Sequence, residues 1–150
     1  MNPGRTFWIL TALAGAFYLL LAGVNHYCFR THAFDMGYYN AALHDFAHGR
    51  FRDFSLNQKG FDCIFADHFS PMLILWAPVQ YIFGSWSLVL GQILAVLGGA
   101  WGVFVLLRAR SPYPWLPWLG ALYLLSYWSV FPALTFDFHD SVPGAMLLPW

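Results

Sequence analysis

The stretch that decides the topology of this chain is Phe69 to Gly84, FSPMLILWAPVQYIFG. It is apolar, but it has only 12 residues over 72–83, and Pro78 interrupts them. A helix needs about 20 apolar residues to cross the hydrocarbon core. Pro71 is a favourable first helical residue because it has no N–H to leave unpaired. The stretch therefore predicts a helix over 71–83 that lies in the membrane interface without spanning it.

Three longer apolar runs surround this stretch. Residues 7–24 form a run of 18, residues 86–107 a run of 22 and residues 115–134 a run of 20, all without a charge. Each is near the length that crosses about 30 Å of hydrocarbon. The first run is longer than the apolar part of a signal peptide, and no small-residue cleavage site follows it, so we interpret it as a retained anchor. The runs predict an all-α, polytopic membrane protein with three spans.

Composition supports the same class. Of the 150 residues, 9% are charged, 59% are apolar and 21% are aromatic, and the net charge is +0. A soluble domain carries about 25% charged residues, so a soluble globular protein is excluded. Without a basic excess we expect no nucleic-acid partner, and membrane lipids are the expected surroundings. The sequence does not indicate an oligomeric state.

Charge also predicts the orientation. If 71–83 does not span, Arg5, Arg108 and Arg110 fall on one side of the membrane, and every acidic residue and histidine falls on the other. The positive-inside rule then places the N-terminus in the cytoplasm of a cell-membrane protein. Residues 25–85 become a long outer loop.

The last nine residues, Val142 to Trp150, resemble the start of a further span. Nine residues cannot cross a bilayer. Either this tail is interfacial or the chain is the front piece of a longer protein. We favour the fragment, with residues 1–150 as a single membrane domain, because a half-built span leaves backbone groups unpaired in lipid.

A second interfacial helix is predicted over about 36–48, within the outer loop. Asp35 is a suitable N-cap and Gly49 a suitable stop. Asn40, His44 and His48 recur every four residues, so they share one stripe of this helix. Two histidines at this spacing can hold a metal, but a solvated polar stripe on an interfacial helix is the favoured interpretation.

Further polar groups have both a structural and a functional interpretation. Asp35 is a helix cap or a reactive acid, and the pair Asp67-His68 precedes a helix start, where capping explains it. The strongest local signal is a trio at the mouth of the third span, namely Asp137, His139 and Asp140. Two interpretations remain open. The three are ordinary loop residues, or His139, between two carboxylates, serves as an acid, a base or a ligand.

Two cysteines and three glycines also bear on the structure. Cys28 and Cys63 both lie on the predicted outer side, where they form one disulfide or remain as free thiols. In the second span we expect three glycines to permit close helix packing: Gly98, Gly99 and Gly102.

The order of these parts resembles a known family. The chain has an N-terminal span, then FDMGYYNAALHDFAHG (34–49), then DHFSPMLILWAPVQYIFG (67–84), a span ending in LLRAR (106–110), and another ending in FDFHD (136–140). It resembles the N-terminal part of an uncharacterised family of predicted membrane proteins. That family in turn is similar to the GT-C superfamily of polytopic glycosyltransferases, which take sugars from polyprenyl-phosphate donors.

The resemblance implies roles for particular residues. Asp35 matches the catalytic acid of the first outer loop, and the substrate-binding residues implied are His68, Asp137, His139, Asn40 and His44. A divalent cation, Mg or Mn, is implied on Asp35 and Asp137. GT-C enzymes have many spans, so this chain corresponds to the front part of one. The alternative is a non-catalytic membrane protein that binds or transports a lipid-linked substrate or scaffolds partner helices.

Overall fold

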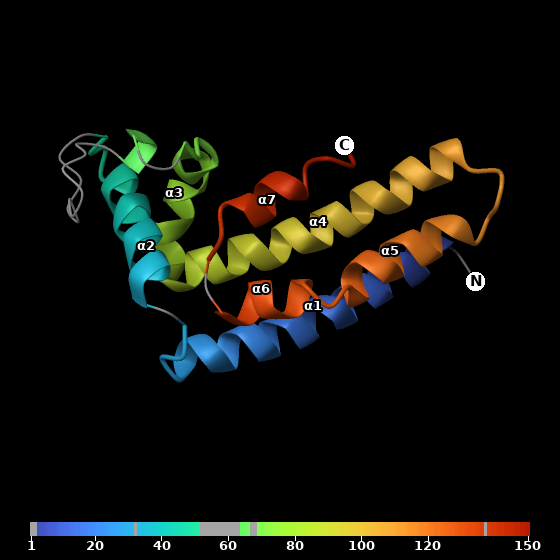
Figure 1. Ribbon diagram of the computed structural model, residues 1–150, viewed down its shortest axis with the longest axis horizontal. Helices are drawn as coiled ribbons and strands as arrows, with labels where there is room; N and C mark the ends of the chain where they lie inside the picture. Colours follow the sequence, from blue (N-terminus) through green and yellow to red (C-terminus); the bar gives the residue numbers. More distant parts are fainter. Residues whose placement is uncertain (1–2, 32, 52–63, 67–68, 137) are drawn as a thin grey trace.

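The computed structural model describes residues 3–31, 33–51, 64–66, 69–136 and 138–150 (Figure 1). These residues form helices and connecting turns, without a strand among them. The elements in chain order are α1 (Pro3–Tyr27), α2 (Ala33–Ala47), a 3-10 turn (Ile64–Ala66), α3 (Met72–Phe83), α4 (Trp86–Arg110), α5 (Leu116–Ser126), α6 (Val130–Phe136) and α7 (Ser141–Ala145). The predicted all-α fold is confirmed.

Three segments are long and apolar enough to cross a membrane: Arg5–Tyr27, Trp86–Arg110 and Leu116–Phe136. They lie side by side and alternate in direction along the chain, with α4 packed against both α1 and α5 (Figure 1). Many of their apolar side chains are exposed, as expected of helices that face lipid.

The third segment is not the continuous helix that we predicted over 115–134. It is divided into α5 and α6, and Tyr127 between them has an extended backbone with ψ of 127°. Pro132 provides the physical reason. Proline has no N–H to bond to the carbonyl four residues earlier, and its ring collides with that carbonyl, here that of Trp128. The helix therefore stops before Trp128 and restarts at Val130.

Residues 142–150 do not form the continuous helix expected at the start of a further span. Only α7 is helical, and turns follow it to the C-terminus. This segment runs back alongside α4 (Figure 1). A Cβ on Gly99 would lie 2.6 Å from the Met146 sulfur, and one on Gly102 would lie 2.8 Å from Trp150 Nε1. These two glycines therefore permit close packing as predicted.

The two short helices of the predicted outer loop both form, with bounds close to those expected. α2 and α3 pack against each other and run across the long helices, at the end where α1 stops and α4 begins (Figure 1). We call this pair the transverse layer, and the end that carries it the transverse end. Gly84, with φ of 54°, makes the sharp turn between α3 and α4. This crossing is the arrangement that helices in a membrane interface require.

The ends of α2 show one correction. The helix starts at Ala33, so Asp35 lies within its first turn and is not the N-cap. A carboxylate there still stabilises the helix through the macrodipole. At the other end Gly49 has φ of 71°, and its N–H donates to the Phe46 carbonyl at 3.0 Å. Gly49 thus ends the helix as predicted.

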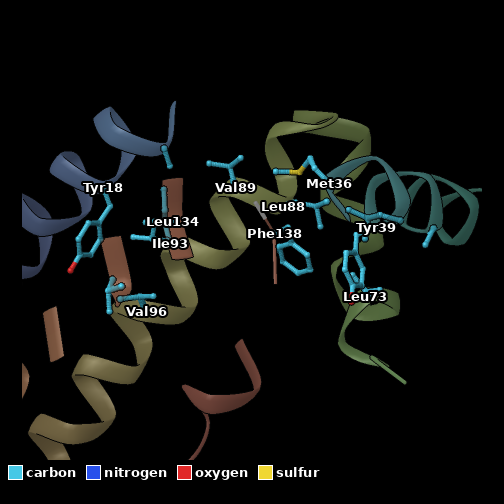
Figure 2. Close-up of a cluster of buried hydrophobic side chains, with 14 of the residues drawn as sticks. Tyr18, Met36, Tyr39, Leu73, Leu88, Val89, Ile93, Val96, Leu134 and Phe138 are labelled. Atoms are coloured by element: carbon cyan, nitrogen blue, oxygen red, sulfur yellow. The ribbon is translucent and has the colours of Figure 1, made fainter. Parts of the chain in front are cut away.

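The main core joins the spans to the transverse layer. Figure 2 shows buried side chains of this core from five helices and the segment after α6: Tyr18 of α1, Met36 and Tyr39 of α2, Leu73 of α3, Leu88, Val89, Ile93 and Val96 of α4, Leu134 of α6, and Phe138. All of them are buried. The core fixes the position of α2 relative to the end of α6.

Candidate functional site

The described acidic and histidine side chains gather at one end of the long helices, where Arg30 and Arg50 also lie. Every Asp and His side chain that the structure describes lies at the transverse end: Asp35, Asp45, Asp140, His26, His44, His48 and His139. Arg5, Arg108 and Arg110 lie at the opposite end, which we call the arginine end. Groups that can act as acids, bases or metal ligands are therefore concentrated at the transverse end.

An apolar groove of about 280 Å³ opens between α3, α4 and α7. On α4 its lining includes Gly91, Ala95 and Gly98, which recur at helical spacing. A Cβ on Gly91 would lie 3.0 Å from the Trp76 ring, whereas one on Gly98 would meet no atom within 4 Å, so the close helix packing that we predicted at Gly98 is absent. Ser70 and Asp140 line the transverse end of the groove, and the Trp150 indole lies toward its other end.

The groove is elongated. Its lining on α4 runs from Leu88 to Gly99, and a rise of about 1.5 Å per residue makes this roughly 16 Å. That length is about half of the 30 Å hydrocarbon core. The groove therefore extends along α4 for about half of that thickness, with Asp140 near its transverse end.

The segment that carries His139 is held by side-chain amides from two spans. The Gln92 amide donates to the carbonyl of Ala133, and Gln92 Oε1 accepts the His139 N–H at 3.2 Å. Asn25 Nδ2 donates to the carbonyl of Thr135 at 3.3 Å. Two of the last four carbonyls of α6 are thereby satisfied, and His139 beyond it is held through its N–H.

Neither of these amides was identified from the sequence. Gln92 is only 3% exposed, and it interrupts an uncharged apolar run in the second span. A polar side chain within a span is expensive in lipid and usually has a specific partner. That signal could have selected Gln92, but the sequence could not identify its partners.

A second network connects the transverse layer to α4. Gln80 Nε2 donates to Asn40 Oδ1 at 3.0 Å, and Ser87 Oγ donates to Gln80 Oε1 at 2.6 Å. Trp76 Nε1 donates to the Ser87 carbonyl at 2.8 Å. Asn40, which we predicted to bind substrate, is thus bonded across to α3.

At the end of α2, Asp45 is 2% exposed and accepts hydrogen bonds from Arg50 Nη2 at 2.6 Å and Nε at 3.0 Å. Sequence reasoning did not select this ion pair. His44 is exposed, with its Nδ1 3.8 Å from Asp45 Oδ1 and its ring 4.2 Å from that of His48. The predicted solvated stripe is confirmed for His44 and His48, which share one exposed face, but Asn40 is half-buried and bonded to Gln80 of α3. Neither histidine lines the groove.

The elements that carry the predicted site residues pack together. Asp35 is partly exposed, and its neighbour Met36 lines a small cavity with Gln92 and Phe138. The Phe138 ring lies 5.1 Å from that of Tyr39, one turn after Asp35.

The first turn of α2 therefore borders the segment that carries His139 and Asp140. His139 is partly exposed. His68 and Asp137 lie outside the described residues, as does Cys63, so the convergence of all four predicted residues stays a prediction.

Met36 also lines a wider cavity of about 700 Å³. This cavity is bounded by the end of α1, the following turn, α2 and the start of α4, and its polar lining includes His26, Thr31 and Ser85. His26 Nε2 lies 3.0 Å from Ser85 Oγ. Thr31 and Met36 line both cavities, so the two are neighbours at the transverse end.

Within the described part of the chain, no three His, Cys, Asp or Glu side chains gather at metal-binding distance. The proposed ligand pair of Asp35 and Asp137 falls outside this result, because Asp137 is not described. Mg²⁺ usually keeps several waters and uses one or two carboxylates plus substrate phosphates. Asp35 or Asp140 could serve as such a carboxylate.

The fold and the position of the polar groups define a polytopic α-helical membrane protein with three candidate spans. The chain belongs to the family described as predicted membrane protein (DUF2079), whose model matches residues 25–150. No curated protein and no solved structure matches the chain.

Proposed function

We propose that this protein is a membrane glycosyltransferase of the GT-C type, which moves a sugar from a polyprenyl-phosphate donor to an acceptor hydroxyl. The observation that carries the proposal is the elongated apolar groove with Asp140 at its transverse end. An isoprenoid chain fits such a groove, and its phosphate then lies beside the first turn of α2. The acceptor fits the cavity with His26 and Ser85, which Met36 of α2 also lines.

In this mechanism Asp35 is the general base. Its carboxylate removes the proton from the acceptor hydroxyl as that oxygen attacks the anomeric carbon of the sugar. The bond from this carbon to the donor phosphate breaks, and the polyprenyl phosphate leaves with the electron pair. His68 and His139 hold the phosphate by hydrogen bonds.

Electrostatics supports a cation in the same place. The Asp140 carboxylate and the donor phosphate are both negative, so they repel unless a positive charge lies between them. Asp35 and Asp137 would hold Mg or Mn together with phosphate oxygens and water. When bound, the ion neutralises charge on the leaving phosphate.

The orientation follows from the separated charges. We propose that the transverse end faces the outside of the cell and the arginine end the cytoplasm. The arginines support this orientation through the positive-inside rule. The sugar would then be transferred on the outer face, in the cell envelope.

The alternative is a protein that binds or transports a lipid-linked substrate without cleaving it. The hydrogen bonds among Asn40, Gln80 and Ser87 favour it, because these groups are used for structure rather than presented to a substrate.

The test is sugar transfer by the full-length protein with Asp35→Asn. We expect the rate to fall at least about a hundredfold, within the usual contribution of a general base. Binding of polyprenyl phosphate without divalent cations, where Asp35 has no metal to hold, should be kept. Asp35→Glu retains a carboxylate and should retain part of the rate, and the thermal unfolding of all three proteins should agree. Unchanged transfer by Asp35→Asn contradicts the role of Asp35. Binding without transfer by the native protein supports the alternative.

A further inference from the structure

The arginine end contains a cavity of about 340 Å³ that is separate from the groove and from the proposed reaction. It lies where α4 turns into α5. Its lining includes Arg108, Ser111 and Tyr113 at the rim, and Phe104 and Trp118 within. A cation thus stands above an apolar floor.

The floor is built by aromatic packing. Phe104 is 6% exposed, and its ring lies 5.0 Å from that of Trp118 and 4.5 Å from that of Phe7. These contacts join α4, α5 and α1, so the floor is fixed by all three candidate spans.

The rim is rigid. Pro112, Pro114 and Pro117 fix the backbone of the turn, since proline restricts φ. The Tyr113 N–H donates to Ser111 Oγ at 3.1 Å, and the Ser111 N–H donates to the Leu107 carbonyl at 2.9 Å. A preformed rim lowers the entropic cost of binding a ligand.

The positive charge of Arg108 at the rim of the cavity favours an anionic ligand. The ion pairs within the described chain join Asp45 to Arg50 and His44, and all described Asp side chains lie at the transverse end. Arg108 is therefore exposed without an acidic partner among the described residues. Arg110, two residues later, is also exposed but does not line the cavity.

The position of the cavity at the end of the candidate spans favours a lipid as the anion. Arg108 lies in the last turn of a candidate span, at the level of the headgroups. Tyr113 and Trp115 are 58% and 56% exposed, with ring centroids 5.8 Å apart, as in an aromatic belt. Basic pockets at the ends of transmembrane helices bind anionic headgroups.

We propose that this cavity binds one anionic glycerophospholipid. Arg108 pairs with the phosphate, and the glycerol end of the acyl chains rests on Phe104 and Trp118. The proposal does not depend on the glycosyltransferase function.

The experiment uses the full chain in nanodiscs of equal parts phosphatidylcholine and phosphatidylglycerol. After extraction, native mass spectrometry counts the phosphatidylglycerol that stays bound. Arg108→Gln should weaken this retention about fivefold, the effect of one arginine at a charged surface. Arg110→Gln is the matched control, because it removes the same charge from the same end, and its retention should change less than about twofold.

Three results would overturn the proposal. The first is an equal loss in both variants, which would show only general surface attraction. The second is equal retention of phosphatidylcholine by the native chain. The third is displacement of the lipid by inorganic phosphate alone, which would show a site for the free anion. Restored retention in Arg108→Lys supports the proposal even if Arg108→Gln unfolds at a lower temperature.

Discussion

The two ends of the helix bundle are held together by different interactions. At the transverse end, amide and hydroxyl groups bond between helices, as with Gln92, Gln80 and Asn25. At the arginine end, the contact among the three spans is aromatic, through Phe7, Phe104 and Trp118. Lipid tails are as apolar as the side chains, so hydrophobic burial alone cannot specify how helices pack in a membrane. Directional hydrogen bonds fix the geometry of the transverse end.

This difference matches what we propose for each end. A reaction site needs groups held in fixed positions, and the hydrogen bonds of Gln92 fix the segment with His139. A lipid site at the arginine end needs only a cation above an apolar surface.

The largest expected effect is a difference in thiol labelling between the two ends, which we propose to lie on opposite sides of the membrane. Cys28 is exposed at the transverse end, and Ser111 lies in the turn at the arginine end. In intact cells, a membrane-impermeant thiol reagent should label Cys28 in a Cys63→Ser background and should not label Ser111→Cys in a background without native cysteines. Permeabilised cells provide the control, since both should then react. Labelling at Ser111→Cys alone, or equally at both positions in intact cells, would refute the proposed orientation.

The next effect concerns the amide that holds the end of α6. Gln92→Met keeps the side-chain length but removes both the donor to Ala133 and the acceptor for His139. Leaving buried groups unpaired costs about 1–3 kcal/mol each in water-soluble proteins and less in lipid, so we expect a loss of about 2 kcal/mol in the free energy of unfolding. Hydrogen exchange of the His139 amide should also accelerate. Unchanged exchange would show that Gln92 does not hold this segment.

A smaller effect is expected at the other end. Phe104→Ala removes ring contacts with Phe7 and Trp118 but unpairs no polar group. Lipid surrounds both the folded and the unfolded spans, so the variant loses ring contacts but no burial from water. We therefore expect the free energy of unfolding to fall by about 1 kcal/mol, near the value of an aromatic pair. Exchange of the His139 amide should remain as in the native protein. An acceleration there would mean that the two ends are not independent.

Much of the fold could be predicted from the sequence because length and hydropathy determine what can span. The shortness of the run before Gly84 and the proline at 71 were enough to predict a non-spanning α3. The break before α6 was missed, because a hydropathy average does not register Pro132. The sequence predicted close packing at Gly99 and Gly102. It did not predict that their packing partners would be Met146 and Trp150 of the C-terminal segment.

The site could be predicted only in part. His139 and Asp140 are adjacent in sequence, so their common location was evident. The bonds of Gln92 to Ala133 and His139 join positions 41 and 47 residues apart, and no spacing rule connects them. Asn40 was selected for its stripe on α2, but its partner Gln80 lies on another helix.

The most direct test of this account asks what occupies the groove between α3, α4 and α7. A polyprenyl phosphate with a diazirine on its chain is photolysed with the full-length protein, and the labelled peptides are mapped. The account predicts labels at Gly91 to Gly98 and at Met146, removed by excess unlabelled polyprenyl phosphate.

Two glycine variants make this measurement specific. Gly98→Leu fills the groove and should reduce labelling about tenfold, whereas Gly144→Leu, which also has open space around it but lies outside the groove, should stay within about twofold of the native chain. Labels spread over lipid-facing residues of α1 such as Leu13 and Leu20, with equal yields in both variants, would contradict the account.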